Sequence, residues 1–210
     1  MYILSISGPI GSGKSSLIKN LIKTFNKQYR IITISEFIDG DPIFGLEMLN
    51  RFIENKISSM TFQYYILDYY ERIISNLNTS QADIILIEKL PYDSVKCFSK
   101  IAYQNSKLTE LEYETLNKKL LKIEQLCNYL PNYLNDINIL NIDNKSQQEV
   151  LNDSINIIQN DIKKNIQKRV ILLNCSLETC ENHITIRNRI GEDKYSKEYL
   201  KTVVEFYKNL

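Results

Sequence analysis

The sequence predicts an α/β fold with a parallel sheet, and two observations support this prediction. Short apolar runs alternate along the 210-residue chain with longer segments of helical periodicity, a pattern typical of strand–helix–strand units. The first apolar run, residues 2–6, is followed directly by a glycine-rich loop and then by an amphipathic segment. A buried strand, such a loop and a helix in this order are typical of α/β proteins that bind phosphate groups.

The glycine-rich loop, residues 8–15, has the sequence GPIGSGKS and matches the phosphate-loop pattern G-x-x-x-x-G-K-[ST] at every fixed position. Its glycines let backbone N–H groups curl around a polyphosphate, and the helix that begins near Gly13 adds the positive end of its dipole. We expect Lys14 to reach the β- and γ-phosphates of ATP and Ser15 to ligate Mg²⁺. The loop residues predicted to bind ATP are Gly8, Gly11, Ser12, Gly13, Lys14, Ser15 and Ser16. The alternative is an accidental glycine-rich turn, which the flanking strand and helix disfavour.

The other elements follow from the periodicity of apolar residues. Four further strands are expected at apolar runs rich in isoleucine and leucine: residues 29–35, 82–87, 137–142 and 170–175. Helices are expected over the segments with a 3.6-residue apolar repeat. Their approximate ranges are 14–25, 43–55, 59–77, 91–105, 108–130 and 196–208, with two more helices opened by the capping residues Ser146 and Ser176.

Composition and charge limit the kind of partner. The chain has 26 Lys and Arg against 25 Asp and Glu, so its overall charge favours a small-molecule ligand over a nucleic acid or a membrane. Its four cysteines lack C-x-x-C spacing and it has one histidine, His183, so we expect no zinc site and reduced thiols in the cytoplasm. No apolar run reaches 18 residues and no signal peptide is recognised, and one ordinary domain is expected over residues 1–210.

Charged residues follow the predicted strands at the edge where ligands bind in parallel α/β sheets. Glu36 ends the second strand, Glu88 and Lys89 end the third, and Arg187 and Arg189 lie in a cationic segment near the C-terminal end. A carboxylate near an acceptor hydroxyl can take its proton, and arginines over phosphates neutralise the charge that develops during transfer. The layout indicates phosphoryl transfer, although for any one acid taken alone a solvated strand end is the better interpretation.

Taken together, these residues resemble the deoxynucleoside kinase family. The resemblance rests on GPIGSGKS, Glu36 after the second strand, Thr61-Phe62-Gln63 in a helix, Glu88-Lys89 after the third strand, and Arg187-x-Arg189 followed by Ser196-x-Glu198-Tyr199-Leu200. It covers most of the chain, and the Phe-Gln pair and the segment 176–200 are more diagnostic than the phosphate loop. The resemblance implies a single P-loop kinase domain over residues 1–210, with three layers, a five-stranded parallel sheet flanked by helices, a lid at about 187–196 and a homodimer.

The resemblance also implies a role for each matching residue. Glu36 resembles the general base that deprotonates the nucleoside 5′-hydroxyl, and Glu88 resembles an acid that helps Ser15 to organise Mg²⁺. Arg187 and Arg189 resemble lid arginines that clamp the phosphates, and with Glu36 and Lys14 they form the predicted catalytic set. The predicted substrate-binding residues are Phe62 and Gln63 at the base edge, Lys89, Phe98 stacked on the base, and Glu192 bonded to the sugar 3′-hydroxyl. Both phenylalanines also fit core positions.

The sequence departs from the family pattern at several positions. Glu88-Lys89-Leu90 replaces a Glu-Arg-Ser motif, so a planar guanidinium becomes a point charge and a hydroxyl is lost. Phe52 stands near the place of a usual tyrosine, His183 stands where an arginine is common, and tryptophan is absent. We expect the first of these changes to weaken or rearrange transfer.

The order of the last strands and helices along the chain also departs from the family pattern. In the family the lid precedes a final strand, an adenine-contacting loop and a closing helix, whereas here a comparable strand, residues 137–142, precedes the lid strand. We infer that the last two strand units are exchanged in chain order while keeping their usual places in the sheet, since a helical crossover is long enough in either direction. Asp143, Asn144 and Lys145 would then contact the adenine of ATP. The alternative makes residues 131–168 an insertion outside the main sheet.

We therefore predict a deoxynucleoside kinase that transfers the γ-phosphoryl group of ATP, with Mg²⁺, to a nucleoside 5′-hydroxyl in cytoplasmic nucleotide salvage. The preferred base stays open. Two alternatives remain: a thymidylate-type nucleoside-monophosphate kinase, and a degenerate kinase kept as a nucleotide-binding or assembly protein. A regulatory GTPase is disfavoured, because Gln147 replaces the aspartate that reads guanine and no D-x-x-G follows the third strand.

Overall fold

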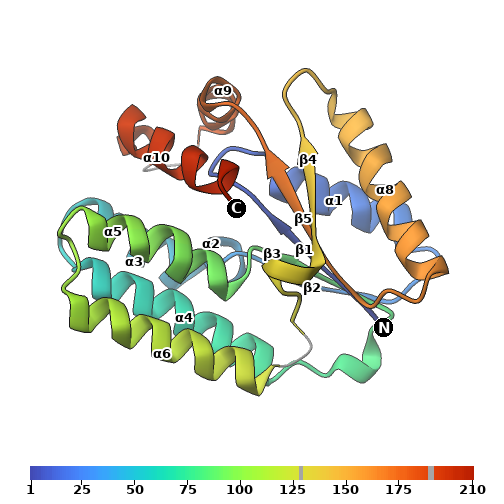
Figure 1. The fold of residues 1–210 in the computed structure, drawn as a ribbon, viewed down its shortest axis with the longest axis horizontal. Helices are drawn as coiled ribbons and strands as arrows, with labels where there is room; N and C mark the ends of the chain where they lie inside the picture. The colour runs from blue at the N-terminus through green and yellow to red at the C-terminus, as the bar shows by residue number, and fades with distance from the viewer. Residues whose placement is uncertain (128–129, 189–191) are drawn as a thin grey trace. The chain divides into compact units, whose positions relative to one another are not determined.

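The computed structural model describes residues 1–127, 130–188 and 192–210. It contains a five-stranded parallel sheet with the spatial order β2-β3-β1-β5-β4 (Figure 1). The strands are β1 (Tyr2–Ser7), β2 (Ile31–Ile34), β3 (Ile84–Glu88), β4 (Ile137–Asn141) and β5 (Lys168–Asn174). Because all neighbouring pairs are parallel, the carboxyl ends of the strands share one edge of the sheet. The predicted α/β class with a parallel sheet flanked by helices is confirmed.

The chain forms two compact units. The sheet unit consists of Met1–Ile34, Asn78–Glu88 and Tyr129–Arg187, and the helical unit consists of Ser35–Leu77, Lys89–Asn128 and Asn188–Leu210. Each unit therefore combines three separate stretches of sequence. The expectation of one domain over residues 1–210, with a lid at about 187–196, stays a prediction.

The sheet unit holds the five strands together with helices that precede or follow some of them. Its helices are α1 (Lys14–Phe25), α7 (Tyr133–Asp136), α8 (Gln147–Lys163) and α9 (Leu177–Arg187), with a short 3₁₀ turn η1 (Thr79–Gln81). α1 and α8 pack against each other, and each turns an apolar stripe inward. β1 and β3 are buried at every position, whereas the edge strands β2 and β4 are partly exposed. This burial explains why the inner strands read as continuous apolar runs.

A buried polar cluster joins α8 to the sheet. The Tyr2 hydroxyl donates to the Asp161 carboxylate at 2.8 Å, and Arg169 donates two hydrogen bonds to the same carboxylate at 2.7 and 2.6 Å. Burial, together with the Asp161 carboxylate, raises the pKa of Tyr2, so its phenol remains a hydrogen-bond donor. The cluster fixes one end of α8 to β1 and β5.

The exchanged order of the last two strand units is present in the sheet. β5, the last strand along the chain, lies beside β1, and β4 takes the outer edge (Figure 1). β4 pairs with β5 from Ile137 opposite Val170 to Asn141 opposite Asn174. The alternative, in which the strand at 137–142 lies outside the main sheet, is wrong.

The helical unit supplies the remaining helices. They are α2 (Phe37–Gly40), α3 (Pro42–Ile53), α4 (Ser59–Ser75), the π-helix η2 (Asp93–Ser99), α5 (Lys100–Gln104), α6 (Glu110–Leu126), the 3₁₀ turn η3 (Glu192–Lys194) and α10 (Lys197–Lys208). The single helix predicted over 91–105 is therefore a π-helix followed by a short α-helix. A π-helix widens each turn by about one residue, a change that the apolar pattern alone does not reveal.

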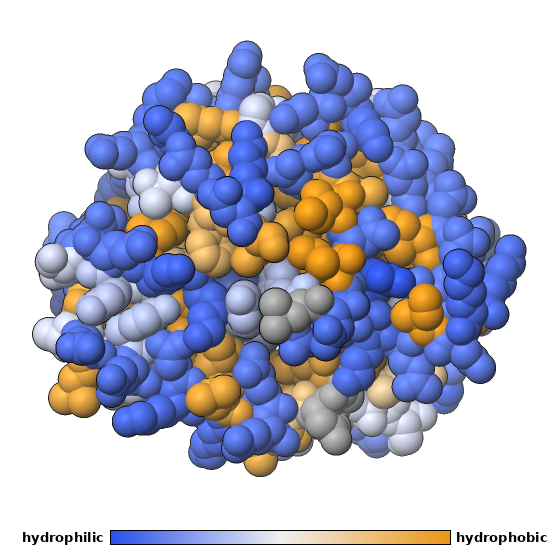
Figure 2. Space-filling model, viewed as in Figure 1, coloured by the Kyte–Doolittle hydropathy of each residue, from blue (hydrophilic) through white to orange (hydrophobic). Residues whose placement is uncertain are grey.

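One face of the molecule is mostly polar, with scattered apolar groups. On the face shown in Figure 2, hydrophilic residues predominate and hydrophobic residues are interspersed among them in small groups. Among the described residues, no helix combines the length and the apolar character that a membrane crossing requires.

Candidate active site

The phosphate loop connects β1 to α1 and has a backbone that only glycine permits. Gly8 and Gly11 have φ angles of 143° and 83°, in the range that residues with a Cβ rarely adopt. A Cβ at Gly8 would lie 2.6 Å from the carbonyl oxygen of Leu173, and one at Gly11 would lie 2.5 Å from that of Cys180. The loop is therefore packed directly onto the backbone of β5 and α9.

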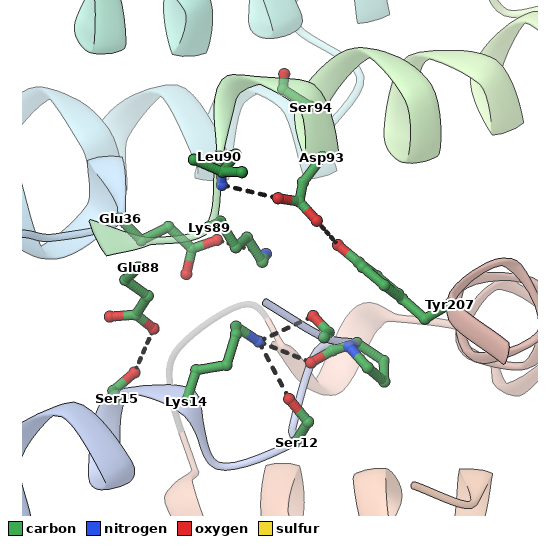
Figure 3. A network of polar contacts seen from close by, with 12 residues as sticks. Ser12, Lys14, Ser15, Glu36, Glu88, Lys89, Leu90, Asp93, Ser94 and Tyr207 are labelled. Carbon is green, nitrogen blue, oxygen red and sulfur yellow. Dashed lines mark hydrogen bonds and ion pairs between the residues drawn. The ribbon is translucent and has the colours of Figure 1, made fainter. Parts of the chain in front are cut away.

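Lys14 is the first residue of α1, and its ammonium group is held among the oxygen atoms of the loop. Its Nζ donates to the carbonyls of Pro9 at 2.7 Å and Gly8 at 3.2 Å, and to Ser12 Oγ at 3.4 Å (Figure 3). The side chain is buried. Gly13, which precedes α1, has no side chain with which to cap the helix, and the N–H groups at the start of a helix suit the binding of an anion.

Ser15 and Glu88 place two oxygen atoms side by side next to the loop. Ser15 Oγ donates to Glu88 Oε1 at 2.6 Å (Figure 3), and Glu88 is buried at the carboxyl end of β3. A hydroxyl and a carboxylate are ligands that suit Mg²⁺, which usually completes its shell with phosphate oxygens and water. Among the described residues, no group of three or more His, Cys, Asp and Glu could hold a metal ion by itself.

The loop after β4 holds the N-terminus of α9. Asp143 Oδ1 accepts from the Ser176 backbone N–H at 2.9 Å and from Thr179 Oγ1 at 2.7 Å. Asn144 has a positive φ of 65°, and Lys145 pairs with Asp153 of α8 at 2.6 Å. Two of the three residues predicted to contact adenine, Asp143 and Lys145, thus have charged side chains that are bonded to other residues of the sheet unit.

In the helical unit, Glu36 and Lys89 form a nearly buried ion pair. Lys89 Nζ donates to Glu36 Oε1 at 2.6 Å, and the two side chains are only 9% and 17% exposed. The same ammonium group lies 4.7 Å from the centroid of the Phe98 ring, within the range of a cation–π interaction. The structure therefore brings together three of the residues predicted to act on the phosphate acceptor.

A hydrogen-bonded turn supports Lys89. The Leu90 N–H donates to Asp93 Oδ2 at 2.7 Å, and the Tyr207 hydroxyl of α10 donates to Asp93 Oδ1 at 2.6 Å (Figure 3). Both Asp93 and Tyr207 are almost completely buried. Sequence reasoning missed this pair: the spacing of Asp93 three residues after Leu90 is a signal for the turn, but nothing in the sequence indicates its contact with Tyr207, 114 positions away.

Gln63 of α4 is buried against η2. Its Oε1 accepts from Ser94 Oγ at 2.7 Å, and the Ser94 carbonyl in turn accepts from Ser99 Oγ at 2.9 Å. Both Gln63 and Ser94 are 5% exposed. Ser94, which no sequence motif marks, thus fixes the amide of the residue predicted to read the base edge.

The remaining predicted substrate residues differ in their surroundings. Phe62 is buried in an aromatic cluster, stacked on Phe52 with ring centroids 4.4 Å apart and edge-on to Phe37 at 5.6 Å. Phe98 is half-buried, Glu192 is buried in η3, and Arg187 is an exposed residue at the end of α9. Arg189 lies outside the described residues. Phe62 therefore has a packing role whatever else it contacts.

A parallel sheet with a phosphate loop between β1 and α1 and an acid at the end of β3 defines the class of P-loop proteins that handle nucleotides. Residues 4–135 match the family model "Deoxynucleoside kinase". The chain belongs to the deoxynucleoside kinase family, as the resemblance predicted.

Individual relatives agree with this family. The "Putative kinase protein 029R" of Invertebrate iridescent virus 3 is 26% identical over 115 residues, which are 54% of this chain and 53% of the relative. The match thus spans about half the length of that protein. A structure of deoxyadenosine kinase from M. mycoides with bound dATP has a TM-score of 0.62 and 16% identity, covering 100% of this chain and 83% of that one. A second structure of that enzyme, with dCMP and dCDP, has a TM-score of 0.63 and 17% identity, covering 99% and 82%. At these identities the two structures show a shared fold.

Proposed function

We propose that this protein is an ATP-dependent deoxynucleoside kinase, which transfers the γ-phosphoryl group of ATP to the 5′-hydroxyl of a deoxynucleoside. The observation that carries the proposal is the dipeptide Glu88-Lys89. Glu88 accepts a hydrogen bond from Ser15 beside the phosphate loop, and Lys89 donates one to Glu36. Consecutive residues are thereby bonded to the expected metal-binding hydroxyl and to the expected general base. Membership of the family supports the same reaction.

On the donor side, the phosphate loop fits a polyphosphate. Lys14 would donate to phosphate oxygens in place of the loop carbonyls that it contacts, and the N–H groups at the start of α1 would donate to the same anion. Ser15 and Glu88 would hold Mg²⁺, which when bound neutralises phosphate charge during transfer. Asp143, Asn144 and Lys145 are proposed to meet adenine mainly through their backbone, because Ser176, Thr179 and Asp153 bind the charged side chains.

On the acceptor side, Glu36 is proposed to take the proton of the 5′-hydroxyl. The Lys89 ammonium holds the Glu36 carboxylate by a short charge-assisted hydrogen bond. Lysine offers a point charge where the family has a guanidinium fork, and it still reaches the carboxylate. Arg187 and Arg189 are proposed to clamp the phosphates, and Glu192 to accept from the 3′-hydroxyl.

Gln63 is proposed to read the base edge with Phe98 stacked on the ring, while Phe62 supports Gln63 from the aromatic cluster. The structural relatives from M. mycoides carry dATP, dCMP and dCDP, which supports deoxynucleosides as the substrate class. A homodimer, cytoplasmic location and a role in nucleotide salvage are proposed from the family resemblance.

The proposal is tested by phosphoryl transfer from γ-labelled ATP with Mg²⁺ to the four deoxynucleosides and, separately, to their monophosphates. Labelled monophosphate formed from one or two nucleosides is the expected result. Labelled diphosphate would assign the protein to the nucleoside-monophosphate kinases instead. ATP binding without any product would favour a degenerate kinase, the alternative that the Lys89-Leu90 replacement suggests.

The role of Glu36 is tested by Glu36→Gln. Glutamine keeps an oxygen for Lys89 but cannot serve as a base, so turnover should fall by about 10²- to 10⁴-fold. The dissociation constant of the nucleoside, measured by calorimetry, should stay within about threefold. Asp39→Asn, a change at an exposed acid of α2, the short helix that begins directly after Glu36, is the matched control. An equal loss of binding and turnover would make Glu36 a structural residue.

A further inference from the structure

One peptide group of the phosphate loop is held from both sides. The carbonyl oxygen of Gly11 lies 2.7 Å from Nδ1 of His183, and the N–H of Ser12, which belongs to the same peptide group, donates to the Pro9 carbonyl at 3.2 Å. A peptide group is planar and trans, so fixing its oxygen and its hydrogen fixes the whole plane. This peptide group lies one residue before Gly13, which opens α1.

The partner of this peptide group is one face of α9. Cys180 and His183 are three residues apart in α9 and therefore lie on the same side of the helix. The Cys180 backbone occupies the space that a side chain on Gly11 would need, and the His183 ring bonds the Gly11 carbonyl. Two successive points of α9 thus contact the same glycine of the loop.

The chemistry of the contact determines the state of the imidazole ring. A carbonyl oxygen can only accept a hydrogen bond, so the ring nitrogen that faces it must carry the hydrogen. The bond therefore requires His183 to carry a hydrogen on Nδ1.

We propose that His183 is the positioning residue that sets the phosphate loop for ATP and links the loop to α9. This inference rests on the proposed function, in that ATP is the anion that the loop binds. His183 and Arg187 are four residues apart on α9 and share a helix face. The bond to the Gly11 carbonyl thus holds α9, and with it Arg187, in place against the phosphate loop.

Three substitutions separate the hydrogen bond from the volume of the ring. His183→Asn keeps an N–H near the position of Nδ1, His183→Gln moves its N–H one bond farther from the backbone, and His183→Leu has none. The asparagine variant should bind ATP within about threefold of the unmodified protein. The leucine and glutamine variants should raise the ATP dissociation constant about fivefold to tenfold, the loss expected for one hydrogen bond. Inorganic tripolyphosphate should show the same order of affinities.

The loss of affinity in the His183 variants should be confined to ATP, the phosphate donor. The KM for the nucleoside should stay unchanged in all three variants, because the hydrogen bond lies within the sheet unit and belongs to the phosphate loop. Asn182→Ala, at an exposed neighbouring position of α9, is the control and should bind ATP normally. Equal ATP affinity in all the His183 variants would overturn the proposal. An asparagine variant that lost as much ATP affinity as the leucine and glutamine variants would overturn it too.

A second measurement needs no variant. Since His183 is the chain's one histidine, nitrogen-15 NMR of the unmodified protein gives a single pair of imidazole signals. The proposal requires the Nδ1–H form of the neutral ring, with both signals shifting when ATP is added, and a ring protonated at Nε2 alone would refute it. These readouts do not depend on catalysis. If nucleosides were not phosphorylated while the tautomer and the ATP affinities came out as expected, the proposed function would fail and the role of His183 would stand.

Discussion

Lys89 has a positive φ of 61°, a conformation that costs about 1–2 kcal/mol for a residue with a Cβ. Two contacts of its side chain offset this cost, the short bond to Glu36 and the approach to the Phe98 ring. A cation–π contact alone contributes about 0.5–2 kcal/mol. The strained backbone therefore persists because it directs the ammonium group at the carboxylate that we propose as the base.

Ser94 determines which way the Gln63 amide faces. Because Ser94 Oγ donates to Gln63 Oε1, the two hydrogens on Nε2 are directed away from η2. A base whose pairing edge carries an unprotonated ring nitrogen, as in cytosine and adenine, can accept one of them. Thymine and guanine present a ring N–H there and match this orientation less well.

We predict that Ser94→Ala lowers the ratio of kcat/KM for deoxycytidine to that for thymidine by about tenfold, the size of one lost discriminating bond. Ser94→Asp should invert the preference, since a carboxylate accepts only and draws Nε2 towards η2. Measuring both ratios with four deoxynucleosides checks the prediction. Ser80→Ala, at a serine in the 3₁₀ turn η1, serves as the control. Unchanged ratios in both Ser94 variants would show that the amide is not oriented by Ser94.

At the scale of elements, α10 supports the turn that carries Lys89. The buried Tyr207 hydroxyl and the Leu90 N–H share the Asp93 carboxylate, so α10, η2 and the turn are joined by one acid. Removing the hydroxyl leaves a buried carboxylate oxygen with one hydrogen bond fewer, which costs about 1–3 kcal/mol.

Tyr207→Phe should therefore lower the free energy of unfolding by about 1–3 kcal/mol. It should also reduce kcat by several-fold, since the Lys89 turn loses its support, while the ATP dissociation constant stays unchanged. Urea unfolding and steady-state kinetics measure these effects. Tyr103→Phe removes a hydroxyl from an exposed ring and should change neither quantity. A stability loss without any change in kcat would make α10 a purely structural support.

The helices α4 and α6 are joined by charges at one place. Lys119 Nζ lies 2.5 Å from Asp68 and 2.8 Å from Glu71, and Lys122 adds a bond to Glu71 at 2.9 Å. The Lys119 side chain is only 10% exposed and that of Glu71 21%, so water screens the ion pair between these two residues weakly. The hydrogen bonds from Lys119 and Lys122 hold the pKa of Glu71 below its ordinary value.

This depressed pKa has a consequence for acid stability. A carboxylate with a lower pKa in the folded state contributes stability at a pH above its unfolded pKa, near 4.3, and loses it as the pH falls through the folded value. Lys119→Met should therefore cost about 1–2 kcal/mol of unfolding free energy at pH 7 and clearly less at pH 3, where Glu71 is closer to protonation. Urea titrations at both pH values check this. Lys118→Met, at an exposed lysine, should cost little at either pH. A cost that did not depend on pH would assign the effect to the lost packing of the lysine stem.

At the scale of the whole molecule, the sequence predicts the sheet better than the site. The strands are recognisable because continuous isoleucine-rich runs suit a sheet covered on both faces. The phosphate loop is recognisable because its sequence pattern requires glycine at fixed positions. The exchange of the last two strand units also follows from chain order, since each strand carries its own flanking motif.

The site is harder to predict from the sequence because its contacts join residues that are far apart in the chain. The sequence places Glu36 and Lys89 at strand ends, yet their ion pair spans 53 positions and the bond between Gln63 and Ser94 spans 31. Phe62 matches the family's base-pocket motif, but a core aromatic and a base-stacking aromatic have the same periodicity, and here the ring is stacked on Phe52. Such pairings become visible only when the folded contacts are known.

The interleaving of the two units bears on how the molecule unfolds. Each unit draws on three separate stretches of chain, so neither can lose its structure without pulling on peptide segments that belong to the other. We therefore predict a single cooperative unfolding transition in urea, in which tyrosine fluorescence and far-ultraviolet circular dichroism coincide. The chain suits this measurement because it has 14 tyrosines and no tryptophan.

ATP at 100 times its dissociation constant should raise the free energy of unfolding by about 2.7 kcal/mol. The rise should displace the whole transition without changing its slope, because a ligand bound to the phosphate loop stabilises everything that unfolds together. Inorganic phosphate at the same concentration, which lacks the chain of phosphoryl groups that the loop cradles, is the control and should shift the midpoint far less. Two transitions, of which ATP displaced only one, would show that the sheet unit folds as a separate domain in spite of the interleaved chain.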